Sequence, residues 1–145
     1  MAVSVKKIVL WRTEVENKPG ILATILEPLV NAKVDLQVVM GYRYPGNEGR
    51  AAIEVCPVLG KKALGAAQGA GLSASSISTL LIEGDNKLGL GQAIAQAISG
   101  AGINLSFLLA QVIRKKYSAI LGFESEEDLR KAATLIKRVT AARKK

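Results

Sequence analysis

The chain has 145 residues, 49% of them hydrophobic, and a formal net charge of +8. It has no histidine and a single cysteine, Cys56, so the commonest general base, the commonest metal ligand and an internal disulfide framework are all excluded. No apolar run approaches the roughly 18 residues of a transmembrane helix, and the residues after Met1 lack the order of a signal peptide. We therefore expect a cytoplasmic protein with no membrane partner.

The positive charge is concentrated at the C-terminus. The last nine residues hold five basic and no acidic side chains; without them, 15 basic residues face 12 acidic ones, a balance of +3. A solvated helix end that complements the negative end of the helix dipole accounts for such a tail. Binding of nucleic acid or another acidic surface is the alternative.

The first half of the chain alternates strand and helix patterns. Residues 8–15 read as a strand, which the turn Asn17-Lys18-Pro19-Gly20 ends. Apolar residues at helical spacing predict a helix over residues 22–30, with Pro28 on its outer face or at a kink. The elements expected next are a strand over 36–44, a hairpin turn over 45–49, a strand over 51–56, a weak helix near 61–68 and a last short strand.

The second half repeats this order. Ser125 is expected to cap the last helix, because its hydroxyl can accept from the helix start and Asp128 stands at the third position of a capping box. The elements before it are a strand over 77–82, a helix over 90–101, a strand over 105–112, a turn at 114–116 and a strand over 117–123.

Residues 15–41 and 84–110 read as two copies of one unit. The offset between them is about 69 residues, far longer than a short solenoid repeat and close to a small domain. Strand–helix–strand–strand–helix in each half is the split βαβ order. The predicted fold is α+β, with two ferredoxin-like βαββαβ units whose antiparallel sheets carry their helices on one face. We expect a first domain over residues 1–74 and a second over 75–145.

These repeated segments resemble the ACT domain, a small regulatory fold. The first copy has Asn17-Lys18-Pro19-Gly20 before its helix and Ala32-Lys33-Val34-Asp35-Leu36 after it. The second has Asp85-Asn86-Lys87-Leu88-Gly89 and Ala101-Gly102-Ile103-Asn104-Leu105, with Leu88 where the family often has proline. Because both motifs recur in order over nearly the whole chain, it resembles a tandem ACT-domain protein without an attached enzyme.

ACT domains commonly pair side by side and bind amino acids or similar metabolites at the interface. The resemblance therefore implies an amino-acid-like effector, a homodimer or higher oligomer, and a partner protein under regulation. Because the sequence has no histidine and no legible nucleophile–base pair, we expect no catalytic residues, and we expect no cofactor. In the first copy it nominates Asn17, Lys18, Pro19, Gly20, Ile21, Leu22, Asp35 and Leu36 as ligand-binding residues. In the second copy it nominates Asn86, Lys87, Leu88, Gly89, Leu90, Asn104 and Leu105.

The chemistry of these residues suits such a ligand. Glycine lets a backbone approach a ligand closely, and the N–H groups at a helix start attract a carboxylate. The asparagines and Asp35 supply polar contacts, including acceptors for an ammonium group. The same residues also make ordinary turns and helix starts, so a purely structural role is the alternative.

RNA binding or a purely protein-binding role is the other alternative. The RRM shares the βαββαβ order, and Lys116-Tyr117-Ser118-Ala119-Ile120-Leu121-Gly122-Phe123 partly matches its third-strand motif. Ser118 and Ile120 stand where stacking aromatics are needed, which disfavours nucleic acid.

A further segment, Tyr42, Arg43 and Tyr44, lies near a predicted strand end, where we expect interface packing.

Overall fold

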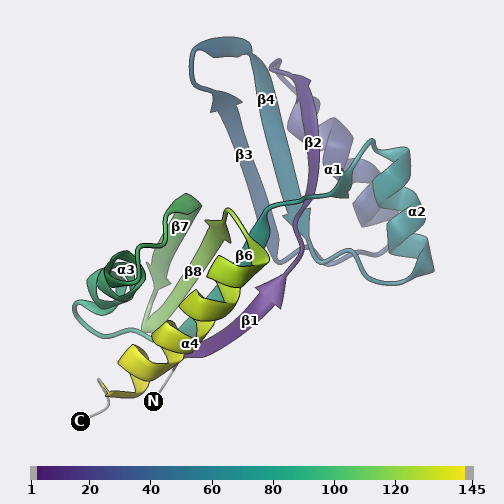
Figure 1. Cartoon of the computed structure of the whole chain (residues 1–145). Helices are drawn as coiled ribbons and strands as arrows, with labels where there is room; N and C mark the ends of the chain where they lie inside the picture. The colour runs from purple at the N-terminus through teal and green to yellow at the C-terminus, as the bar shows by residue number, and fades with distance from the viewer. Residues whose placement is uncertain (1–2, 143–145) are drawn as a thin grey trace. The chain divides into compact units, whose positions relative to one another are not determined.

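The computed structural model describes residues 3–142, and these form two compact units (Figure 1). The first unit comprises residues 9–76, and the second comprises residues 3–8 with residues 77–142. Each unit has one four-stranded antiparallel sheet and two helices. The predicted fold class, two ferredoxin-like units with all-antiparallel sheets, is confirmed.

The first unit contains six elements in the order strand, helix, strand, strand, helix, strand. They are β2 (Trp11–Glu16), α1 (Ile21–Asn31), β3 (Val38–Tyr44), β4 (Asn47–Cys56), α2 (Lys61–Gly69) and β5 (Ser73–Ala74). The sheet order is β3-β4-β2-β5, which leaves β3 at one edge. In Figure 1 the β3–β4 hairpin and β2 lie side by side, as their pairing requires.

One face of this sheet is apolar and packs against both helices. Ile25 and Leu29 of α1 and Ala67 of α2 are buried with Val15, Ala51, Ile53 and Val55 of the sheet. The alternation along β2 and β4 places every second side chain on this face. The polar side chains between them lie on the opposite face.

The second unit follows the same plan with a different source for one strand. Its elements are β1 (Ser4–Ile8), β6 (Ser78–Asp85), α3 (Leu90–Gly100), β7 (Leu105–Ile113), β8 (Lys116–Phe123) and α4 (Glu126–Ala142). The sheet order is β1-β6-β8-β7, so β1 takes the edge position that β5 holds in the first unit. Its core joins Ile94 and Ile98 of α3, Leu129 and Ile136 of α4 and Leu121 of β8.

The sequence prediction of one strand over residues 8–15 was wrong. Residues 4–8 pair with β6, from Ser4 opposite Glu83 to Ile8 opposite Thr79, whereas residues 11–16 pair with β4. As far as residue 142, where the description ends, no strand follows α4 in the second repeat, and β1 covers the edge of β6 instead. The unit boundary near residue 76 lies close to the expected 74/75 boundary, but residues 3–8 belong with the second unit.

The edge strand β7 is unlike the edge strand β1. β1 carries Lys6 and Lys7, charges that discourage pairing with another chain. β7 has no charged residue, and Leu108, Leu109, Val112 and Ile113 are 44–60% exposed. β7 is therefore a long apolar edge.

No helix within residues 3–142 is both long enough and apolar enough to span a bilayer.

Candidate ligand-binding site

A pocket of about 290 Å³ lies where α1 begins beside the edge strand β3. Three of the predicted site residues, Asn17, Ile21 and Leu22, line it. The rest of its lining comes from β3 and β4, namely Gly41, Tyr42, Arg43, Ala51, Ala52 and Ile53. The pocket thus combines an apolar wall with the amide of Asn17 and the guanidinium of Arg43, whereas the hydroxyl of Tyr42 donates to Glu54.

The turn that leads into α1 is held in place by the β3–β4 hairpin. The backbone N–H of Asn17 donates to the carbonyl of Gly49 at 2.9 Å, and its side-chain Nδ2 donates to the carbonyl of Glu48 at 2.8 Å. Gly20 then adopts a φ of +86°, a left-handed conformation that L-residues rarely adopt. Asn17 therefore fixes the turn, and the chain enters α1 at the mouth of the pocket.

The amino end of α1 presents backbone donors without a side-chain cap. Ile21 N–H donates to Lys18 O at 3.3 Å and Thr24 N–H to Gly20 O at 3.1 Å. The helix has no capping side chain and no acid in its first turn, so the N–H groups of Leu22 and Ala23 are left for another acceptor. This end of the helix is electrostatically suited to a carboxylate.

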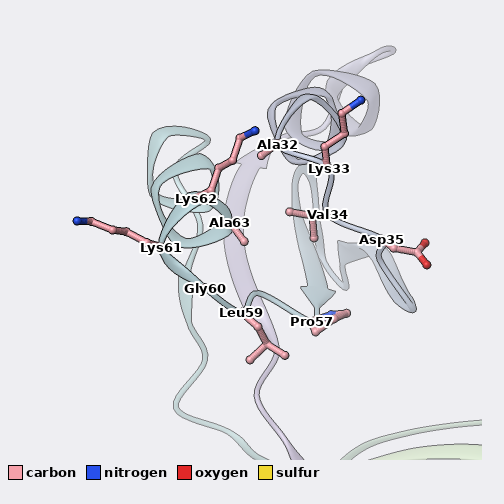
Figure 2. A pocket seen from close by; sticks show the side chains of 10 residues that line it. All are labelled: Ala32, Lys33, Val34, Asp35, Pro57, Leu59, Gly60, Lys61, Lys62 and Ala63. Atoms are coloured by element: carbon pink, nitrogen blue, oxygen red, sulfur yellow. The ribbon is translucent and has the colours of Figure 1, made fainter.

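Asp35 and Leu36 lie at the opposite end of α1 from this pocket. The helix has 11 residues, which at 1.5 Å per residue separates its ends by about 16 Å. Asp35 lines a different cavity, of about 420 Å³, with Lys33, Val34 and the start of α2 (Figure 2). Leu36 is half-buried and packs against the core of the first unit. One chain therefore does not bring the two predicted halves of this site together.

The second unit repeats the turn. Gly89 has a φ of +82°, Leu90 N–H donates to Lys87 O at 3.0 Å, and α3 likewise has no side-chain cap. Asn86 N–H donates to Lys115 O at 2.8 Å. Of the remaining predicted residues, Leu88 and Asn104 are exposed, Leu90 is buried in the core and Leu105 packs against it.

A hydrogen-bonded cluster on the helix-free face of the first sheet was not found by sequence reasoning. Arg12 donates to Glu14 at 3.2 Å and to the hydroxyl of Tyr44 at 2.5 Å, and that hydroxyl donates to Glu14. Tyr42 donates to Glu54 at 2.8 Å, while Glu54 is fully buried and its Oε1 has no hydrogen-bond partner within the described part of the chain. Alternation places these five residues on one face, but only the register of β2, β3 and β4 brings them together.

The cluster perturbs the acidities of its members. Burial alone would lower the pKa of Arg12, but hydrogen bonds with Tyr42, Tyr44 and Glu14 outweigh it and raise that pKa. The hydrogen bond from Tyr44, aided by Arg12, lowers the pKa of Glu14. Burial and the hydrogen bond to Glu54 raise the pKa of Tyr42. Arg12 and Glu14 are therefore held as an ion pair next to the tyrosines.

Other expected features have a plainer placement. Tyr117 and Phe123 are buried in the core of the second unit. Ser125 Oγ accepts from Asp128 N–H at 3.1 Å, which confirms the predicted cap of α4. Within residues 3–142, no three His, Cys, Asp or Glu side chains gather as a metal site requires. Of the basic tail, Arg143, Lys144 and Lys145 lie outside the described residues.

Comparison with known proteins supports the architecture. No family model matches the sequence, and no curated protein matches it. Among solved structures, a protein of Bacteroides thetaiotaomicron matches with a TM-score of 0.72 at 14% identity, over 90% of this chain and 88% of that one. The regulatory subunits of aspartate kinase from Thermus thermophilus and Thermus flavus match with TM-scores of 0.64 and 0.60, both at 17% identity, over 96% of this chain and 97% of theirs. At these identities the likeness concerns the fold. The chain has the fold of two ACT-like units in tandem, as its resemblance to tandem ACT-domain proteins predicted.

Proposed function

We propose that this chain is a non-catalytic regulatory protein that binds an amino-acid-like metabolite where two copies meet. The observation that carries the proposal is the pocket beside β3, which joins Asn17, Ile21 and Leu22 to Arg43 on an edge strand. Arg43 and the uncapped start of α1 suit a carboxylate, and the apolar wall suits a side chain. Solved structures with this fold include regulatory subunits of aspartate kinase, which supports a regulatory role.

A two-fold axis at an edge strand would complete the site. If β3 of one copy paired antiparallel with β3 of a second copy, the start of one strand would lie beside the end of the other. Asp35 and Leu36 precede β3, whereas Arg43 lies near its end, beside the pocket. The pairing would therefore carry Asp35 of a second copy toward the pocket of the first, where a carboxylate can accept from an ammonium group.

The second unit supports pairing between copies independently. β7 is an edge strand of nine residues without a charge, and four of its apolar side chains are at least 44% exposed. Natural edge strands are usually blunted by charge or proline, so such an edge calls for a partner strand. Pairing of β7 with a second copy would cover it, and would also carry Asn104 toward the turn Asn86–Leu90 of that copy.

RNA binding is less well supported. The two aromatics of the RRM-like segment, Tyr117 and Phe123, are 6% and 1% exposed and belong to the core. Base stacking needs exposed aromatic faces. The metabolite-binding role also fits a cytoplasmic protein that regulates a partner protein.

The test is isothermal titration calorimetry after a thermal-shift screen with the twenty amino acids, since a ligand that binds the native state raises the melting temperature. Arg43→Ala should weaken the binding of any hit about tenfold or more. Gly20→Val should weaken it as well, because the side chain would disturb the turn at a φ of +86°. Arg114→Ala, in the β7–β8 turn, is the control and should bind as the unaltered protein does.

Two outcomes would refute the proposal. One is that no amino acid or related metabolite shifts the melting temperature at millimolar concentration. The other is a hit whose affinity is unchanged by both the Arg43 and the Gly20 substitutions in folded protein. Sedimentation of Leu109→Lys tests the dimer separately, since a charge on the β7 edge should favour the monomer.

A further inference from the structure

We propose that the cavity between the end of α1 and the start of α2 is a second binding site, which takes an organic anion with an apolar body and a phosphate or carboxylate head. This site is separate from the pocket beside β3, and the proposal does not depend on the function proposed above. Three features carry it: the shape and lining of the cavity, its unpaired lysines, and the unfavourable positions that these lysines occupy.

The cavity has the size and lining of a small-molecule site. Its volume is about 420 Å³, within the range of roughly 300–1,000 Å³ that is usual for ligand pockets. Figure 2 shows Val34 and Ala63 facing one another across it, with Leu59 and Pro57 beneath them. Leu59 is 79% exposed, a large apolar surface left open at a cavity. An apolar body would cover this surface and gain the free energy of burying it.

Three lysines, Lys33, Lys61 and Lys62, surround this apolar floor, and only one acid, Asp35, lines the cavity with them. None of the three lysines makes an ion pair with any residue in the described part of the chain. In Figure 2, Lys33 and Lys62 project from the upper rim, Lys61 projects to one side, and Asp35 points the opposite way. Lysine stems are flexible, so the ammonium groups can converge on an anion in the cavity.

All three lysines occupy positions that cost stability. Lys61 and Lys62 form the first turn of α2, which contains no acid, although a cation there is repelled by the positive end of the helix dipole. α4 has three acids in its first turn. Lys33 has a φ of +63°, where the second unit has Gly102 at +72°. A non-glycine residue in the left-handed region is destabilising.

An anion in the cavity would reverse this penalty, because it would neutralise the lysines and meet the N–H groups at the start of α2. Phosphate and carboxylate share this chemistry, and the structure favours neither. The probes are therefore phenyl phosphate and phenylacetate, with phenol as the body alone and inorganic phosphate as the head alone. Calorimetry gives the affinity, and amide shifts in ¹⁵N NMR locate the site.

At least one of the two aromatic anions should bind more tightly than phenol and inorganic phosphate. Its amide shifts should centre on Lys33, Val34 and residues 61–64. Lys61→Gln with Lys62→Gln should weaken binding about tenfold, and the unbound variant should be no less stable than the unaltered protein. Lys115→Gln, which replaces a lysine in the β7–β8 turn, is the control and should bind normally. Gly20→Val, which alters only the other pocket, should also bind normally.

Lys33→Gly gives a readout that a merely structural role would not produce. It should stabilise the free protein yet weaken anion binding by about threefold. Arg114→Gly removes the other non-glycine residue with positive φ among residues 3–142, at +58° in the β7–β8 turn of the second unit; it should also stabilise, with affinity unchanged. The proposal is overturned if neither anion binds at millimolar concentration, if the double variant binds as tightly as the unaltered protein, or if Lys115→Gln loses as much affinity.

Discussion

The two units share one fold but differ at equivalent positions. Both begin their first helix after a left-handed glycine, Gly20 or Gly89. After that helix, the first unit has Lys33 where the second has Gly102. The second helix has nine residues in the first unit and 17 in the second. The fourth strand follows in sequence as β5 in the first unit but is β1, from the start of the chain, in the second.

Some positions have the same residue in both units because the backbone conformation requires it, whereas others differ between the units. The turn before α1 or α3 keeps glycine in both copies, because the chain must reverse direction there at a positive φ. The turn after α1 tolerates lysine at a cost, which suggests that the side chain contributes something other than stability. The units diverge most where a fold of this kind is permissive: the last helix, the last strand and the charges on the edges.

The largest difference between the two units is expected when β1 is removed. Deleting residues 2–8 exposes the edge of β6 and removes Val3, which is buried against Gly84. We expect the second unit to lose its cooperative fold while the first unit keeps its own sheet. Amide hydrogen exchange should show protection lost in β6 and β8 and retained in β2 and β4. Val3→Ala, which leaves the strand pairing intact, is the control and should cost far less.

Equal loss of protection in both units would contradict the assignment of β1 to the second unit alone. Unchanged protection in β6 would show that β1 contributes nothing to the fold.

The next effect in size is a cavity at equivalent core positions. Leu29 of α1 and Ile98 of α3 are separated by the offset of the repeat, and they are 0% and 2% exposed. Leu29→Ala and Ile98→Ala should each lower the free energy of unfolding by about 2–5 kcal/mol. Urea denaturation followed by residue-resolved NMR would show which unit is affected. Each change should act mainly on its own unit, and Val30→Ala, at an exposed position of α1, should have little effect.

Element order could be predicted from the sequence because local patterns set it. The strand and helix periods, the turn at Asn17–Gly20 and the cap at Ser125 each act within a few residues, and the structure has all of them. The break between β1 and β2 was missed because residues 8–15 show no turn residue. A strand pattern also does not identify its partner, so the pairing of β1 with β6, some 75 residues away, left no local sign.

Part of the lining of the candidate pocket could be predicted from the sequence, but its arrangement could not. The Asn17–Leu22 turn was found from its motif, and Asn17, Ile21 and Leu22 do line a pocket. That Asp35 lies at the other end of α1 follows from the length of the helix, which a motif match does not consider. Around the second cavity, Lys33 lies 28 residues before Lys61, and Lys62 follows Lys61 directly. Only the packing of α1 against α2 brings Lys33 close to the other two.

A smaller effect follows from exchanging Lys33 and Gly102 between the repeats. Lys33→Gly should stabilise the first unit by about 1 kcal/mol, because glycine has no Cβ to strain at positive φ. Gly102→Lys should destabilise the second unit by about the same amount. The changes are measured by chemical denaturation without added anions. Two shifts of the same sign would mean that the left-handed turn is not what distinguishes the two positions.

The smallest effect is expected from the ion pair that joins β1 to α4. Lys7 Nζ lies 2.8 Å from Glu126 Oε1, and Ser78 donates to the other oxygen at 3.2 Å. The hydrogen bond from Lys7 lowers the pKa of Glu126, although both side chains are about half exposed and solvent weakens the pair.

Because the pKa of Glu126 in the folded protein lies below its unfolded value, the stabilisation is present above the unfolded pKa and is lost as the pH falls through the folded pKa. Glu126→Gln should therefore weaken the second unit at about pH 6 and have a smaller effect at about pH 2, because protonation of the carboxylate removes the ion pair. Glu14 gives the matched case in the first unit, since Tyr44 and Arg12 lower its pKa. Glu14→Gln should change the pH dependence of the first unit and leave that of the second unaltered, as followed by urea denaturation with residue-resolved NMR. If Glu126→Gln instead altered the first unit, or acted equally at both pH values, its effect would not arise from the pair with β1.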